Sequence, residues 1–176
     1  MARTRIDLDS LLAVALDIVD TEGPSELTLS NVAAGLGVRP SALYTHVDGV
    51  EGLHEMVAVR ARSNLTKSVR TSAIGVAGAD AVQAIASAYR GFAQRHPGQY
   101  WVTITNVEVR SDDTSGIHDV FEAVFTAGGL PHSEASAAAS SAHASLHGFV
   151  SMEAVGDAGD DAHFSHLVQL LAGLCH

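Results

Sequence analysis

The sequence predicts an all-α protein, and three observations carry that prediction. Apolar residues recur at spacings of three and four through almost the whole chain, which is the period of an amphipathic helix. No stretch alternates apolar and polar residues as a half-buried strand does, and glycine and proline separate the apolar segments. We expect an N-terminal three-helix unit over residues 1–50, joined by a long helix to a helical domain over residues 51–176.

The first predicted helix covers residues 9–21, with Asp9 or Ser10 as its cap and Gly23–Pro24 as its stop. Its apolar stripe consists of Leu8, Leu11, Leu12, Ala15, Ile18 and Val19. A second helix starts at Thr28, whose hydroxyl can accept a hydrogen bond from a backbone N–H of the first turn. Gly37 ends it, because glycine adopts the left-handed conformation of a helix C-terminus without steric cost.

The third predicted helix covers residues 40–46 and opens with a proline, a residue favoured in the first helical turn. Leu43 and Val47 point to the core, which leaves arginine, serine, tyrosine, threonine and histidine facing outward. Such donors suit phosphates and base edges, and two short helices around a glycine turn are the layout of a DNA-reading helix-turn-helix. The expected DNA contacts are Thr28, Arg39, Pro40, Ser41, Ala42, Tyr44, Thr45 and His46.

The rest of the chain predicts helices separated by short polar or glycine-rich segments. Asp48 can cap a long helix over residues 50–69, which is the only predicted element that joins the two parts. A loop over residues 72–78 follows, and then a helix that ends at His96–Pro97–Gly98. The remaining predicted helices contain Tyr100 to Ile104, or cover residues 117–127, 133–155 and 162–174.

The helix-turn-helix segment resembles the tetracycline-repressor (TetR) family of transcriptional regulators. The pattern L-T-x-x-x-V-A-x-x-L-G-V-x-x-x-x-L-Y-x-H-V is matched in fixed register from Leu27 to Val47. A second segment, AHASLHGFVSME over residues 142–153, is similar to the dimerisation-helix motif of one branch of the family, with His147–Gly148 at its centre. The sequence departs from the family at Val50, where members usually carry a phosphate-binding lysine.

The resemblance implies a homodimer that binds a palindromic double-stranded DNA operator and that a small-molecule effector releases. The net charge of −10 is unevenly distributed, in a way that agrees with this expectation. Residues 1–70 hold seven Lys or Arg against nine Asp or Glu, whereas residues 71–176 hold three against eleven. Screening at physiological salt acts over about 8 Å, so a distant acidic domain repels DNA weakly. Arg3, Arg5 and Arg39 are the expected phosphate contacts of the less acidic part.

Aromatic side chains between residues 89 and 125 mark the expected effector pocket, because such pockets are mostly apolar with a few polar groups. Ordinary core is the alternative for each of them. The candidate residues are Tyr89, Phe92, Tyr100, Trp101, His118, Phe121 and Phe125. Asn106 adds a further polar tip.

The last two predicted helices are amphipathic and rich in alanine and serine, which lets helices approach closely. Their larger residues either complete the core of one chain or form a four-helix contact between two chains, and the resemblance favours the dimer. The expected dimer residues are Leu146, Phe149, Val150, Phe164, Leu167, Val168 and Leu171.

A metal-binding or unrecognised enzymatic helical bundle is the alternative function. His143 and His147 lie four residues apart, a spacing that can chelate a metal, but metal sites prefer three or four ligands. No H-E-x-x-H, G-x-S-x-G or phosphate-loop motif is present, so we expect no enzyme, no metal and no cofactor. The single Cys175 forms no internal disulfide, and the absence of a leader or a long apolar run predicts a cytoplasmic protein without a membrane span.

Overall fold

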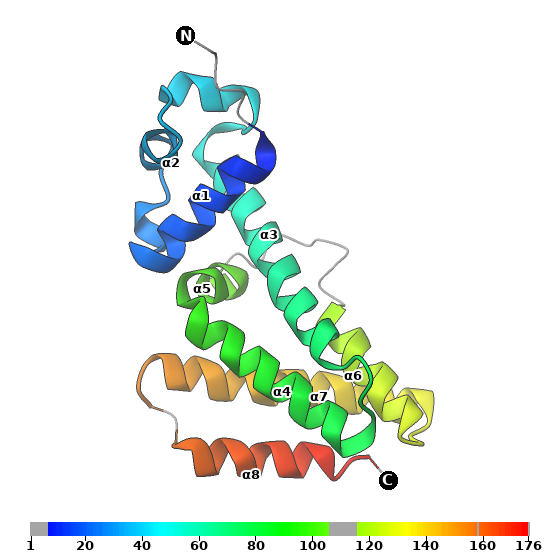
Figure 1. Cartoon of the computed structure of the whole chain (residues 1–176). Coiled ribbons are helices and arrows are strands. Elements are labelled where there is room, and N and C mark those ends of the chain that lie inside the picture. The colour runs from blue at the N-terminus through cyan, green and yellow to red at the C-terminus, as the bar shows by residue number, and fades with distance from the viewer. Residues whose placement is uncertain (1–6, 106–115, 158, 176) are drawn as a thin grey trace. The chain divides into compact units, whose positions relative to one another are not determined.

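The computed structural model describes residues 7–105, 116–157 and 159–175, and every regular element within these ranges is a helix (Figure 1). The all-α prediction is confirmed. The chain forms two compact units, whose described residues are 7–63 with 96–105, and 64–95 with 116–157 and 159–175. Among the described residues, no helix combines the length and the hydropathy that crossing a membrane requires.

The first unit contains α1 (Leu8–Thr21), η1 (Pro24–Glu26), α2 (Leu29–Gly35), η2 (Pro40–Thr45), the first part of α3 (Gly49–Ser72), and α5 (Pro97–Thr105). Leu11, Ala15, Val32, Leu43 and Leu53 are fully buried and form one core that α1, α2, η2 and α3 share. The helix α1 is capped by Asp7, whose Oδ1 accepts a hydrogen bond from the Ser10 backbone N–H at 2.7 Å. The expected cap at Asp9 or Ser10 is wrong because Leu8 already lies inside the helix.

The position of α5 is the main difference from the expected organisation. The sequence assigns residues 96–105 to the C-terminal domain, whereas α5 packs against α1 in the first unit. The Asp20 carboxylate of α1 holds the N-terminal turn of α5. It accepts hydrogen bonds from the Gln99 backbone N–H at 2.9 Å and from the Gln99 side chain at 2.7 Å. His96 Nδ1 lies 2.9 Å from the same carboxylate. Arg62 of α3 adds a hydrogen bond to the Thr103 carbonyl at 3.2 Å.

The chain passes between the two units at two described places, within α3 and at the junction of α4 with α5. The expectation that the long helix alone joins the two parts is therefore wrong. Through these two described junctions a conformational change in the second unit can reach the first, and the second junction leads directly to α5 on α1.

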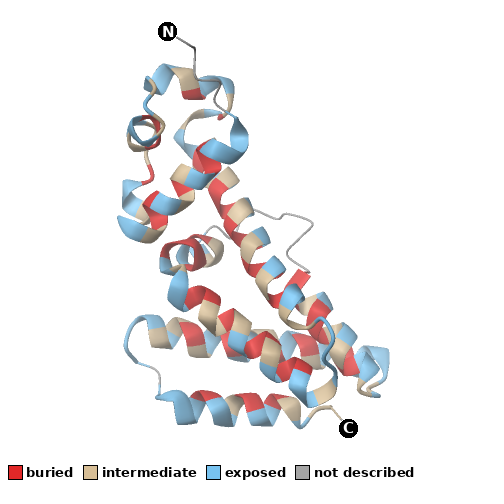
Figure 2. Ribbon diagram, in the orientation of Figure 1, coloured by how far each residue is buried: buried red, intermediate tan, exposed pale blue. Residues whose placement is uncertain are grey.

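The second unit contains the remainder of α3, α4 (Gly78–Arg95), α6 (Gly116–Ala127), α7 (His132–Ala154) and α8 (Asp161–Ala172). Helix α6 packs along α7, and α4 contacts α6, α7 and α8. Figure 2 shows that the buried residues of α4 and α8 face the interior of this unit while the outer side of α8 is exposed. Ile85, Phe121, Phe125 and Leu146 are fully buried at its centre.

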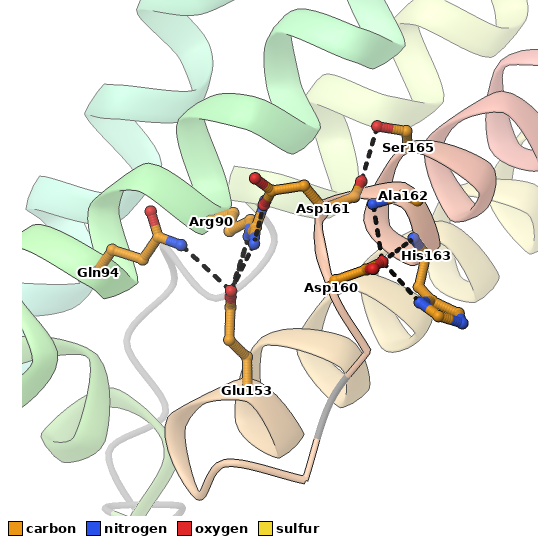
Figure 3. A network of polar contacts seen from close by, with 8 residues as sticks. All are labelled: Arg90, Gln94, Glu153, Asp160, Asp161, Ala162, His163 and Ser165. Carbon is orange, nitrogen blue, oxygen red and sulfur yellow. Dashed lines mark hydrogen bonds and ion pairs between the residues drawn. The ribbon is translucent and has the colours of Figure 1, made fainter.

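Arg90 joins three helices of the second unit through its guanidinium group (Figure 3). It forms ion pairs with Glu153 near the end of α7 and with Asp161 at the start of α8, the latter at 2.7 Å. The guanidinium also lies 4.5 Å from the centroid of the Phe164 ring, a cation–π distance. Hydrogen bonding to Arg90 lowers the pKa of Glu153 and, in return, raises the pKa of Arg90. Arg90 thus holds the end of α7 and the start of α8 against α4.

Candidate nucleic-acid interface

Helix α2 begins as the sequence predicts. The Thr28 hydroxyl accepts a hydrogen bond from the Asn31 backbone N–H at 3.1 Å, so Thr28 is the N-cap. The Asn31 side chain in turn donates to the Glu26 carbonyl at 2.8 Å, which ties the helix to the preceding segment. Thr28 therefore stabilises the start of α2, the first helix of the helix-turn-helix.

The turn after α2 depends on two glycines. Gly37 has φ +67°, the left-handed conformation expected at the helix end, and the Val38 N–H donates to the Ala33 carbonyl at 2.9 Å. Gly35 allows the close approach of α2 to α1, because a Cβ there would lie 2.6 Å from Val14 Cγ1. Sequence analysis identified the role of Gly37 and missed that of Gly35.

The predicted recognition helix is present as the 3₁₀ helix η2, Pro40–Thr45. Leu43 is fully buried and anchors it to the core, whereas Tyr44 is 62% exposed on the opposite side. Arg39, Pro40, Ser41 and Thr45 are also exposed, while Ala42 and His46 are half-buried. The Thr45 hydroxyl donates to the Ala42 carbonyl at 3.0 Å, which leaves its oxygen as an acceptor. The element therefore presents a polar face on a fixed apolar anchor.

Two contacts tie α3 to earlier segments of the first unit. His54 Nε2 lies 2.8 Å from the Leu27 carbonyl oxygen, and Arg60 forms an ion pair with Asp9 at 2.7 Å. Val50, which occupies the place of the usual lysine, is exposed and offers no donor from its side chain. The expected phosphate contacts Arg3 and Arg5 lie outside the described residues.

With this geometry established, the comparisons with known proteins identify the family. Residues 82–172 match the family described as "Tetracyclin repressor-like, C-terminal domain". Rv0681 of Mycobacterium tuberculosis, an uncharacterized HTH-type transcriptional regulator, is 34% identical over 96% of this chain and 81% of its own length. The chain belongs to the TetR family. It is accordingly a DNA-binding transcriptional regulator and not an enzyme.

Solved structures share the fold of this TetR-family chain. A protein of unknown function from Rhodococcus sp. RHA1 matches with a TM-score of 0.80 and 22% identity over 100% of both chains. BioQ of Mycobacterium smegmatis matches with a TM-score of 0.73 and 24% identity over 97% of this chain and 98% of its own. A further BioQ structure, which contains its natural double-stranded DNA operator, matches with a TM-score of 0.76 and 23% identity over 97% and 99% of the two chains.

The structure divides the expected effector residues of this TetR-family regulator between the two units. Tyr89, Phe92, His118, Phe121 and Phe125 lie in the second unit, and the last two stack with ring centroids 5.9 Å apart. Tyr100 and Trp101 lie in the first unit, on α5, where Tyr100 is buried and Trp101 is half exposed. Asn106 lies outside the described residues. The expectation of one common effector pocket therefore applies only to the five residues of the second unit.

The second unit also places polar groups among those aromatic residues. The Tyr89 hydroxyl lies 3.5 Å from His147 Nδ1, and the Tyr89 ring meets the edge of the His143 ring at a centroid distance of 5.8 Å. Burial lowers the pKa of His143 to about 4, with the neighbouring His147 and His118 as lesser causes. His143 is thus a neutral, interior side chain at physiological pH.

The structure places most of the expected dimer residues in the core of the single chain. The side chains of Leu146, Val150, Phe164, Val168 and Leu171 are all buried within one chain, and those of Phe149 and Leu167 are half-buried. The packing of α7 on α6 and α4, and of α8 on α4, accounts for this burial. Amphipathic spacing identifies a face that is covered, but it does not tell which helix covers it.

Proposed function

We propose that this chain is a dimeric transcriptional repressor that binds a palindromic operator and that a small molecule releases. The observation that carries the proposal is the exposed polar face of η2 on the buried Leu43 anchor, next to a turn held by Gly37. Within that face, Arg39, Ser41 and Thr45 are proposed to contact bases, and Tyr44 and His46 to contact phosphates. The BioQ structure with its operator supports DNA binding by a protein of the same fold.

The proposal is tested by a gel shift with the DNA that flanks the gene. A repressor dimer is expected to retain a fragment that contains inverted half-sites and to release an equally long fragment without them. Retention that is equal for all fragments would contradict operator recognition. A repressor role also requires lower transcription from the retained promoter when the protein is added in vitro. Small molecules that abolish the shift identify the effector class.

Replacing Tyr44 by Phe tests the proposed phosphate contact. The change removes one hydroxyl from a side chain that is 62% exposed, so the fold is expected to keep its stability. Loss of one hydrogen bond to a phosphate is expected to weaken binding by about 0.5–1.5 kcal/mol on every sequence. Fluorescence anisotropy with operator and with unrelated DNA measures both affinities. A changed base preference with unchanged operator affinity would assign Tyr44 to bases instead.

The proposed dimer surface is the exposed stripe of α7 rather than its buried face. Ser141, Ala144, Gly148, Met152 and Val155 follow at spacings of three and four, and all five are exposed. Small residues along one half of the stripe permit close approach of a second helix, and Met152 and Val155 supply apolar area at the other half. Leu170, which is 60% exposed on α8, offers further apolar surface. A four-helix contact of α7 and α8 from two chains would bury these side chains.

Gly148→Trp tests this surface. Gly148 is exposed and no atom lies within 4 Å of the position of a Cβ there, so a side chain can extend from it toward solvent, where an indole would obstruct a close helix contact. We expect the variant to sediment as a monomer and to bind the operator at least tenfold more weakly, because a half-site contact alone remains. Ser87→Trp, on an exposed position of α4, is the matched control and is expected to remain a dimer. If Gly148→Trp and Ser87→Trp both remain dimers, the dimer contact does not include the exposed stripe of α7 at Gly148.

The proposed effector contacts lie in the second unit, beside Tyr89 and His147. Effector pockets need a few polar groups that orient a ligand within an apolar lining, and these two side chains belong to the same unit as the buried Phe121 and Phe125. Binding must be stronger in one conformation than in the other for release to occur. The junction of α4, which carries Tyr89, with α5 on α1 gives such a difference a direct route to the DNA-binding unit.

A further inference from the structure

A cluster of histidines and carboxylates lies at one end of the α6–α7 pair and is not explained by DNA binding. His118, Asp119 and Glu122 come from the first turns of α6, and their ligand atoms all lie within 4.8 Å of one another. His132, the first residue of α7, brings its Nδ1 to 2.9 Å from Glu122 Oε1. Three potential ligands thus meet on α6, and His132 of α7 contacts one of them within the second unit.

The orientation of the His118 ring is fixed by α7. Its Nε2 lies 3.2 Å from the Ser136 carbonyl oxygen and 3.4 Å from the Ser136 hydroxyl. The tautomer with the proton on Nε2 donates to this carbonyl oxygen, which can only accept. In the neutral ring, Nδ1 then presents its lone pair. It faces Asp119 Oδ1 at 3.6 Å and Glu122 Oε2 at 3.5 Å. A cation between Nδ1 and the two carboxylate oxygens would interact favourably with all three groups.

The two distances suit a shared metal ion better than direct hydrogen bonds. N–H···O bonds have lengths of about 2.7–3.2 Å. Two ligands that each lie about 2.0–2.2 Å from a tetrahedral ion are separated by about 3.3–3.6 Å. A histidine whose second ring nitrogen donates to a backbone carbonyl is also the usual arrangement of a metal ligand.

We propose that His118, Asp119 and Glu122 bind a zinc ion, and that His132 orients Glu122 through its contact with Oε1. One imidazole and two carboxylates, with solvent in the fourth position, suit Zn²⁺, whereas Mg²⁺ and Ca²⁺ prefer oxygen ligands alone. Asp119 and His132 are exposed, so an ion can enter from solvent, while Glu122 and His118 are largely buried and hold the inner side. The ion holds the His118 ring, whose Nε2 contacts Ser136 of α7. His118 belongs to this site rather than to the proposed effector contacts.

The test is titration of zinc chloride into chelator-treated protein, followed by isothermal calorimetry. We expect one ion per chain, and we expect Glu122→Gln and His132→Gln each to weaken binding at least tenfold. The exposed His132 is not needed for folding, and circular dichroism verifies both variants. His166→Gln, which changes an exposed histidine of α8, is the matched control and is expected to bind like the wild type. Zinc should raise the Tm of the wild type and the control alone.

Three outcomes would overturn the proposal. Absence of zinc binding up to millimolar concentrations would mean that this cluster is not a metal site. Equal affinity of the wild type, Glu122→Gln and His132→Gln would place the ion elsewhere in this histidine-rich chain. Loss of zinc binding in His143→Gln, with Glu122→Gln and His132→Gln unaffected, would assign the zinc site to the His143 and His147 pair. None of these results depends on operator binding, so the repressor proposal stands or fails separately.

Discussion

Gly98→Ala is expected to lower the free energy of unfolding by more than about 3 kcal/mol, the largest effect of any substitution considered. A Cβ at Gly98 would lie 1.7 Å from the Val19 carbonyl oxygen and 2.8 Å from the Asp20 backbone nitrogen. These are backbone atoms of α1, so no side-chain rotation relieves the overlap. Helix α5 must move away from α1, and the hydrogen bonds from Gln99 to Asp20 are then lost.

Gly52→Ala is the matched control, because Gly52 is also a helical glycine of the first unit. A Cβ there meets only the Asp48 Cβ at 3.4 Å and a backbone carbon at 4.0 Å, which are ordinary contacts. Alanine is favoured over glycine within helices by about 1 kcal/mol, so this variant is expected to be as stable as the wild type or slightly more so. Denaturant unfolding measures both variants. Equal stability of Gly98→Ala and Gly52→Ala would show that α5 does not pack on α1 through Gly98.

The sequence alone predicted the elements that local chemistry determines. The Thr28 cap and the turn at Gly37 follow from the hydrogen bond and the backbone conformation that these residue types favour, and both are present. The anchor Leu43 was likewise predictable. Leu43 and Val47 are apolar residues four positions apart among polar ones, and both are buried. These features carry the proposed operator contacts, which explains why that part of the site was accessible from sequence.

Features that depend on pairing between distant segments were not predictable in this way. Gly98 looked like a helix stop after His96–Pro97, but its absent side chain serves contact with Val19, far away in the sequence. His118, Asp119 and Glu122 of the proposed zinc cluster are neighbours on α6, but the contacts that orient them come from His132 and Ser136 of α7. Amphipathic spacing also gave the covered face of α8 but not its neighbour, which is α4 of the same chain.

The stability of the protein is expected to fall by about 3 kcal/mol between pH 6.5 and pH 4 through His143 alone. The pKa of His143 is lowered from its usual 6.5 to about 4, mainly because burial disfavours the charged imidazolium. Above pH 6.5 neither the folded nor the unfolded state binds this proton. Between the two values the unfolded chain binds it and the folded chain does not, so unfolding becomes more favourable as the pH falls. Below about pH 4 both states are protonated, and the effect is complete.

His143→Gln removes this titration and is expected to flatten the pH dependence over that interval. The free energy of unfolding, measured by denaturant titration at several pH values in the presence of a chelator, compares the two proteins. Glu153 provides an internal reference, because its lowered pKa makes its contribution disappear at lower pH than that of His143. Both proteins should therefore share the loss of stability below about pH 4.5, which leaves the higher interval specific to His143. Parallel curves between pH 6.5 and pH 4.5 would show that the His143 ring is hydrated rather than enclosed beside Tyr89. The polar interior that the effector proposal uses would then be absent.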